Sequence, residues 1–159
     1  MGKGAPEINE ALSAGDGRFA IVVARWNDSI TYKLRDGAVE TLKEHGASPD
    51  QIEVFYVPGS FELPMLADKL ASTGNYAAVI CLGAVIQGDT MHHEYINHAV
   101  AHGIMNAARD HGIPVMFGVL TCMNDQQAMD RAGGSVGHKG IEVAQAALEM
   151  VSVYRSLAD

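Results

Sequence analysis

The chain has 159 residues, a length typical of one domain. Lysine and arginine number 11 and aspartate and glutamate 19, so the formal net charge is −8 at pH 7. A balance this acidic argues against a nucleic acid or an anionic membrane as the partner. Hydrophobic residues make up 48% and charged residues 19%, which excludes a disordered chain.

The cysteines and the first residues bear on the compartment. Cys81 and Cys122 are too few for a disulfide framework and lie in apolar runs, where buried free thiols are expected. Residues 1–17 hold no apolar stretch resembling a signal peptide, and no window approaches the ~18 consecutive apolar residues of a membrane span. We therefore expect a soluble protein in a reducing compartment, the cytoplasm.

Apolar runs and segments of helical spacing alternate along the chain. Residues 1–17 are Gly-rich and polar, and predict an arm, either mobile or added to a neighbouring chain, ahead of a single domain over 18–159. The expected elements are strands at 19–24, 52–57, 77–82 and 115–120, and helices at about 30–45, 61–71, 91–109 and 140–157. Continuous apolar strands between helices predict a three-layer α/β/α sandwich around a four-stranded parallel sheet.

Ligands bind at the carboxyl ends of parallel strands, so the segments that follow the strands are the candidate site. In the third of these, Gly83 and Gly88 are expected to bracket a turn before a helix near Thr90, whose free N–H groups suit an anion. The segment matches neither the Walker A pattern nor GxGxxG. A phosphate cradle and an ordinary Gly-rich turn both stay open.

Histidines and a carboxylate open the helix after this turn. His92, His93 and Glu94 are candidates for proton transfer near neutral pH. Glu94, His98 and His102 recur at i, i+4 and i+8 and could in principle hold a metal. This stripe lies opposite the apolar face, so we favour a solvated or subunit-facing surface and expect no metal.

Aromatic residues follow the first two strands. Trp26 and Phe61 lie beside Ser60 and Glu62, a combination that suits a flat heterocycle needing both stacking and hydrogen bonds. The alternative is a pair of core aromatics at strand ends.

Two basic residues flank a Gly-rich bend between helical segments. In so acidic a chain, Arg131 and Lys139 are candidates for a phosphate clamp, Arg131 through its forked guanidinium. The alternative is a pair of surface charges near a helix break.

Read in order, five blocks resemble the 6,7-dimethyl-8-ribityllumazine synthase family. They are RWN at 25–27, VPGSFELP at 57–64, GAVIQGDTMHHEY at 83–95, PVMFGVLT at 114–121 and DRAGGSVGHKG at 130–140. The resemblance covers the chain from about Phe19 onward. It implies a flavodoxin-like α/β domain that joins 5-amino-6-(D-ribitylamino)uracil to 3,4-dihydroxy-2-butanone 4-phosphate, the penultimate step of riboflavin synthesis, without cofactor or metal.

The resemblance also implies roles for individual residues, with His92 as the proton-transfer residue. Contacts to the ribitylaminouracil fall to Trp26, Ser60, Phe61, Glu62, Ala84, Val85, Ile86 and, from a neighbouring subunit, Phe117. Contacts to the butanone phosphate fall to Asp89, Thr90 and, again from a neighbour, Arg131. Glu94, which orients or relays protons to His92, and Lys139 are auxiliary candidates. The implied assembly is a pentamer, in some members part of an icosahedral shell whose N-terminal arms extend a neighbour's sheet.

Three positions depart from the common pattern of this family. Many members carry Arg in place of Gln87, an aromatic residue in place of His93 and Asn in place of His138. Loss of a cation at Gln87 is expected to weaken phosphate binding. Two interpretations of other classes stay open: an aldolase-like enzyme with Lys139 as a Schiff-base nucleophile, and a non-enzymatic shell-forming or flavin-carrying protein.

Overall fold

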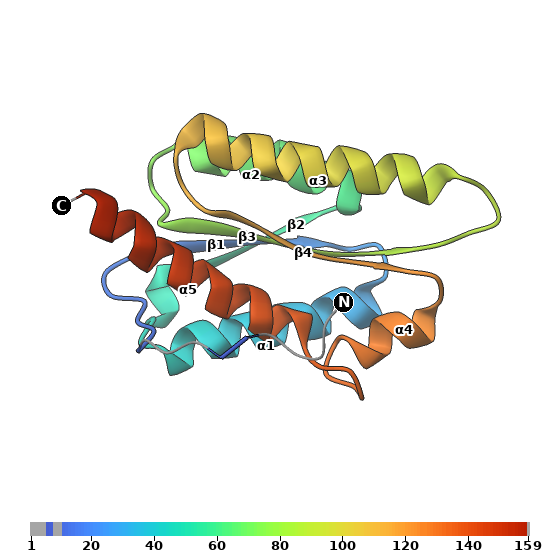
Figure 1. The fold of residues 1–159 in the computed structure, drawn as a ribbon, viewed down its shortest axis with the longest axis horizontal. Helices are drawn as coiled ribbons and strands as arrows, with labels where there is room; N and C mark the ends of the chain where they lie inside the picture. The colour runs from blue at the N-terminus through green and yellow to red at the C-terminus, as the bar shows by residue number, and fades with distance from the viewer. Residues whose placement is uncertain (1–5, 8–10, 159) are drawn as a thin grey trace.

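The computed structural model describes residues 6–7 and 11–158 (Figure 1). Its four strands form one parallel sheet in the order β2-β1-β3-β4. They are β1 (Phe19–Ala24), β2 (Ile52–Val57), β3 (Ala78–Ile86) and β4 (Val115–Cys122). The helices are α1 (Asp28–Glu44), α2 (Leu63–Ser72), α3 (His92–His111), α4 (Asp125–Asp130) and α5 (Lys139–Ala158), with short 3-10 turns η1 (Pro49–Gln51) and η2 (Ser60–Glu62).

Helices cover both faces of the sheet, so the predicted three-layer α/β/α sandwich is confirmed (Figure 1). Side chains of a strand point to alternate faces. Phe19, Ile21 and Val23 of β1 therefore pack with α1 and α5, whereas Ala20 and Val22 pack with α2 and α3. Every residue of β1 is buried, as expected for a central strand of a covered parallel sheet.

The expected bounds of β1 and β2 are confirmed, whereas β3 and β4 run further than expected. The prediction that Gly83 belongs to a turn is wrong, because β3 continues to Ile86 and Gly83 pairs with Val119. The need for glycine at position 83 comes from a close contact and not from a turn. A Cβ at Gly83 would lie 2.4 Å from the Ser60 hydroxyl oxygen, so only glycine lets the β2–α2 loop approach the strand this closely.

Residues 11–17 of the expected arm lie against the domain itself. Ala14 is buried, and its N–H donates to the His45 carbonyl at 2.9 Å. The Gln51 side-chain amide donates to the carbonyls of Gly15 and Gly17 at 3.0 and 2.7 Å. Residues 1–5 and 8–10, on which the rest of the expected arm falls, lie outside the described residues.

Both cysteines are free and buried, as expected. Burial raises the pKa of the Cys81 thiol to about 12 and also raises the pKa of Cys122. These thiols are therefore protonated at neutral pH and poorly suited to nucleophilic chemistry. In the part of the chain that the structure describes, no helix is long and apolar enough to span a membrane.

Candidate active site

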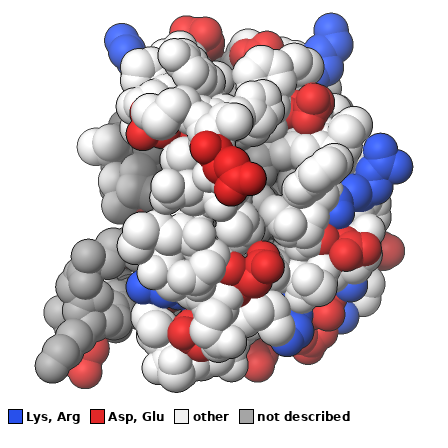
Figure 2. Space-filling model, turned by 90° about the vertical axis from the view of Figure 1, so that its right-hand side faces the viewer, with Lys and Arg blue, Asp and Glu red and all other residues white. Residues whose placement is uncertain are grey.

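A pocket of about 440 Å³ opens at the carboxyl ends of β1, β2 and β3. It lies where the strand order reverses between β1 and β3, the switch point at which open α/β sheets bind ligands. Figure 2 shows the molecule with this end toward the viewer. The pocket is lined by Trp26, Asn27, Gly59, Ser60, Phe61, Glu62, Ala84, Val85, Ile86, Gly88, Thr90, His92, His93 and Ile96.

The pocket thus brings together most of the predicted site residues from three separate loops. Asp89 and Glu94 are absent from its lining and lie exposed beside it, in the turn before α3 and in the first turn of that helix. Asn27 and Gly59 line the pocket without having been predicted individually. The signal for Asn27 was its place between a buried strand and a helix, where asparagine tolerates a left-handed backbone.

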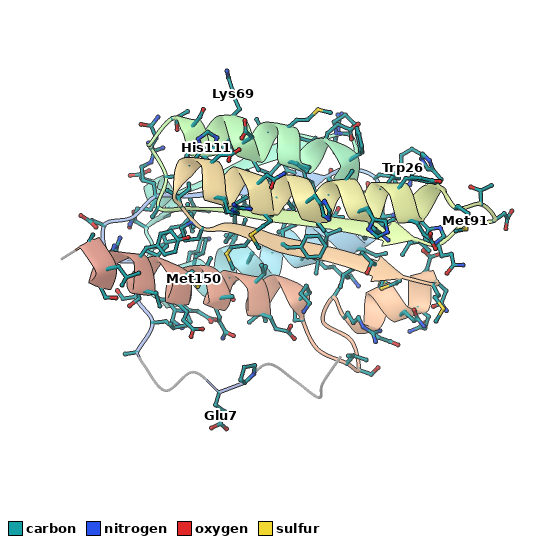
Figure 3. The ribbon with its side chains drawn as sticks, turned by 45° about the horizontal axis from the view of Figure 1, so that its top comes forward. Glu7, Trp26, Lys69, Met91, His111 and Met150 are labelled. Carbon is teal, nitrogen blue, oxygen red and sulfur yellow. The ribbon has the colours of Figure 1, made fainter. Side chains whose placement is uncertain are left out.

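The aromatic residues of the pocket present their rings to solvent. Trp26 is 75% exposed and Phe61 48% exposed, which excludes the alternative of core aromatics at strand ends. Trp26 lies at the end of the molecule where α3 begins, as does Met91 (Figure 3). An exposed ring beside polar groups and a strand backbone is suited to stacking on a planar heterocycle.

The β2–α2 loop supplies the polar groups of one wall. The Gly59 N–H donates to Glu62 Oε2 at 3.0 Å, which holds the carboxylate at the start of the loop. Ser60 is buried against Gly83 of β3. Phe61 was expected in the helix, but it lies in η2, and this extra turn places its ring in the pocket wall before α2 begins at Leu63.

The two histidines at the start of α3 differ in their contacts. The His93 ring is tied back to the preceding turn, with Nδ1 3.0 Å from the Thr90 carbonyl oxygen. Among the described residues, no hydrogen bond fixes the His92 ring, which also lines the pocket. His92 is the histidine left available for a ligand.

The Glu94, His98 and His102 stripe is exposed on α3. Across residues 6–7 and 11–158, no group of three His, Cys, Asp or Glu side chains is placed to hold a metal ion.

Phe117, Arg131 and Lys139 do not reach this pocket within one chain. They line a second, largely apolar groove of about 880 Å³ beside β4, between α3 and α5. The Arg131 guanidinium donates to the Gln127 carbonyl at 2.9 Å, and the Lys139 ammonium lies 2.8 Å from a Glu142 carboxylate oxygen. A lysine paired in this way is not the desolvated amine that Schiff-base chemistry needs.

Among the described residues, neither a lysine nor an arginine lines the His92 pocket. Acidic side chains lie near the middle of this end of the molecule, and basic ones lie mainly toward its margin (Figure 2). Any cation that pairs with a phosphate group bound here must therefore come from outside the pocket's own lining.

The bend between α4 and α5 is anchored by His138. A Cβ on Gly37 would lie 2.2 Å from the His138 ring, so the ring packs directly on the backbone of α1. Burial lowers the His138 pKa, although Glu142 and Asp36 favour the charged form. The ring is thus held neutral beside the segment that carries Arg131 and Lys139.

This lowered pKa predicts an acid-sensitive fold. The unfolded chain takes up a proton at His138 near its ordinary pKa of about 6.5, before the folded chain does, so the free energy of unfolding decreases as the pH falls below about 6.5. Thermal unfolding between pH 7.5 and 5 is expected to show a smaller decrease in melting temperature for His138→Asn than for the unmodified chain. Equal decreases would show that His138 does not contribute.

Sheet order and pocket position together define a flavodoxin-like α/β fold with a candidate ligand site at the carboxyl ends of its strands. A family profile described as 6,7-dimethyl-8-ribityllumazine synthase matches residues 16–155. The chain belongs to the 6,7-dimethyl-8-ribityllumazine synthase family. The resemblance drawn from the sequence blocks is therefore confirmed.

Two curated relatives carry the same enzyme name. The chain is 47% identical over 151 residues to "6,7-dimethyl-8-ribityllumazine synthase" of Chlorobium luteolum, an alignment that covers 95% of this chain and 97% of the relative. It is 46% identical over 148 residues to "6,7-dimethyl-8-ribityllumazine synthase, chloroplastic" of Arabidopsis thaliana, covering 92% of this chain and 65% of the relative.

Proposed function

We propose that this chain is a transferase of riboflavin biosynthesis that condenses 5-amino-6-(D-ribitylamino)uracil with 3,4-dihydroxy-2-butanone 4-phosphate to 6,7-dimethyl-8-ribityllumazine. Membership of the family, at 47% identity over nearly the whole chain, is the observation that carries the proposal. The pocket supports it, because it combines exposed aromatic rings with a strand backbone and an unrestrained histidine.

The ribitylaminouracil occupies the part of the pocket between the loops after β1 and β2 and the end of β3. Trp26 stacks on the pyrimidine, and the backbone of residues 84–86 pairs with the polar edge of the ring. Ser60, Phe61 and Glu62 contact the ring and the ribityl chain. The butanone phosphate lies toward the turn before α3, beside Asp89 and Thr90, where helix N–H groups favour an anion.

In the reaction, the 5-amino group of the uracil attacks the ketone of the butanone phosphate, and one water leaves as the imine forms. Phosphate is then eliminated, and the ribityl-bearing nitrogen closes the second ring with loss of a second water. His92 moves protons in these steps, and Glu94 orients it or relays protons to it. Holding both substrates in attack geometry supplies the rest of the rate increase.

The complete site needs a second copy of the chain. Among the described residues, no lysine or arginine lines the pocket, whereas Phe117 and Arg131 line the groove beside β4, the last strand in the described strand order. A neighbouring copy that brings its groove to this pocket supplies Arg131 to the phosphate and Phe117 to the pyrimidine, with Lys139 as an auxiliary cation. We place the assembly at a pentamer, and the mass of the purified particle decides whether pentamers form an icosahedral shell.

Arg131→Ala is expected to raise the KM for the butanone phosphate roughly 10- to 100-fold, because a charge-assisted contact to phosphate is lost. The KM for the ribitylaminouracil should change little. Steady-state rates with each substrate varied in turn measure both constants. An unchanged KM for the phosphorylated substrate would remove Arg131 from the site.

The proposed activity is tested by mixing the purified protein with both substrates. Lumazine absorbance and product mass are followed, with the uncatalysed condensation subtracted. Acceleration with one phosphate released per lumazine supports the proposal. A folded oligomer that gives no acceleration contradicts it and favours a binding or packaging role.

The two unpaired, buried thiols support a cytoplasmic location.

A further inference from the structure

We propose that Asn27 is a positioning residue, which holds the Trp26 segment at a fixed place relative to the end of β3 and so sets the width of the pyrimidine subsite. The inference rests on the proposed function for the identity of the substrate. The contacts of Asn27 that support the inference do not depend on which substrate the pocket binds.

Asn27 has an unusual backbone conformation. With φ 63° and ψ 45° it lies in the left-handed region, and it is the one non-glycine residue with positive φ in the described ranges 6–7 and 11–158. Such conformations are unfavourable for residues with a Cβ and persist where the surroundings enforce them. A residue held in this way at the rim of a pocket points to a function for its side chain.

The Asn27 side chain links two parts of the pocket lining. Asn27 Nδ2 donates a hydrogen bond of 2.8 Å to the carbonyl oxygen of Ala84, 57 residues away in the chain. The pairing of β1 with β3 ends at Val23↔Leu82, and no other strand of the described ranges pairs with β3 on that side as it continues to Ile86. The Asn27 amide supplies a donor that the missing strand would have provided.

The backbone around Asn27 is fixed on the opposite side as well. The Trp26 N–H donates to the Pro58 carbonyl at 2.9 Å, and the Asn27 carbonyl accepts the N–H groups of Ile30 and Thr31 at 2.9 and 3.0 Å. One short segment is thereby tied to the loop after β2, to α1 and, through the Asn27 side chain, to β3.

The Trp26 ring depends on this arrangement. Because the side chain is 75% exposed, its own packing does little to hold it, and its position follows that of its backbone. The ring and the backbone of residues 84–86 face the same pocket. A heterocycle that contacts both needs their separation fixed, and the Asn27–Ala84 hydrogen bond joins the two walls directly.

Two variants separate the side chain from the backbone conformation. Asn27→Gly keeps the left-handed backbone and removes the hydrogen bond. Asn27→Asp keeps the size but places a carboxylate oxygen against the Ala84 carbonyl. Asn75→Gly, in the exposed loop before β3 at the amino end of the sheet, is the control for the general effect of replacing an asparagine by glycine.

Both Asn27 variants are expected to raise the KM for the ribitylaminouracil, by about three- to tenfold for Asn27→Gly and by more for Asn27→Asp, with the KM for the butanone phosphate within about twofold. Asn75→Gly should leave both constants unchanged. Equal changes in the two constants, or none in the Asn27 variants, would overturn the inference.

Trp26 fluorescence provides a readout that does not need turnover, because Trp26 is the single tryptophan of the chain. Asn27→Gly is expected to lower the steady-state anisotropy of Trp26 in the free protein, whereas Asn75→Gly should not. An unchanged anisotropy overturns the positioning role even if the enzyme is active. If Asn27→Gly lowers the anisotropy but the unmodified protein forms no lumazine, the positioning role is supported and the proposed function is contradicted.

Discussion

His92→Ala is expected to slow lumazine formation by about 10²–10⁴-fold, the usual contribution of a positioned general acid–base residue. The His92 side chain lines the pocket, and no hydrogen bond to another described residue restrains its ring. Binding of the ribitylaminouracil should change little, since stacking and backbone contacts hold that substrate. Single-turnover rates at saturating substrates measure the chemical step.

His93→Ala is the matched control for this prediction. The His93 ring is held by the Thr90 carbonyl, so its loss is expected to disturb the turn before α3 and to reduce the rate by much less than the loss of His92. A larger effect for His93→Ala than for His92→Ala would contradict the assignment and give the proton-transfer role to His93. Equal rates for His92→Ala and the unmodified enzyme would contradict proton transfer by His92 and the mechanism that depends on it.

Gly140→Ala is expected to destabilise the fold by about 1–3 kcal/mol or more, the usual cost of forcing extra atoms into a packed core. A Cβ at Gly140 would lie 2.1 Å from the carbonyl oxygen of Leu34 in α1. The obstacle is backbone, which cannot move aside as a flexible side chain does. Relief of the clash requires α5 to shift away from α1.

Thermal and urea unfolding at one fixed protein concentration measure this effect, because assembly makes the apparent stability concentration-dependent. Gly88→Ala is the control for stability, since a Cβ there meets nothing within 4 Å and its backbone lies outside the left-handed region. Its free energy of unfolding is expected to change by less than about 0.5 kcal/mol. A Gly140→Ala protein as stable as Gly88→Ala would show that the two helices separate readily.

The class of fold and the place of the pocket follow from the sequence because both depend on local patterns. Apolar runs predict the bounds of β1 and β2, and the rule for parallel sheets places the pocket in the loops after the strands. What was missed depends on contacts distant in sequence. Gly83 belongs to the strand because β4 pairs with it and Ser60 packs against it.

The same limit applies within the site. The bond between Asn27 and Ala84 joins residues 57 positions apart, and no spacing in either segment predicts it. Phe117 was expected in the site only through the family resemblance, whereas Arg131 was also a candidate phosphate clamp from its place beside the Gly-rich bend. One chain holds both residues in the groove beside β4, away from His92, and the proposed site brings them to His92 only across two copies.

The sharpest test of a site shared between copies mixes two variants, each of which has little activity when the butanone phosphate is kept far below the KM of Arg131→Ala. His92→Ala and Arg131→Ala subunits are unfolded together, reassembled in equal amounts and assayed with both substrates. In a ring, a random mixture restores about one quarter of the sites, each pairing His92 of one copy with Arg131 of the next. The predicted result is activity near one quarter of that of the unmodified enzyme reassembled in the same way. Activity no greater than the mean of the two variants, in oligomers shown to be mixed, would place the whole site within one chain.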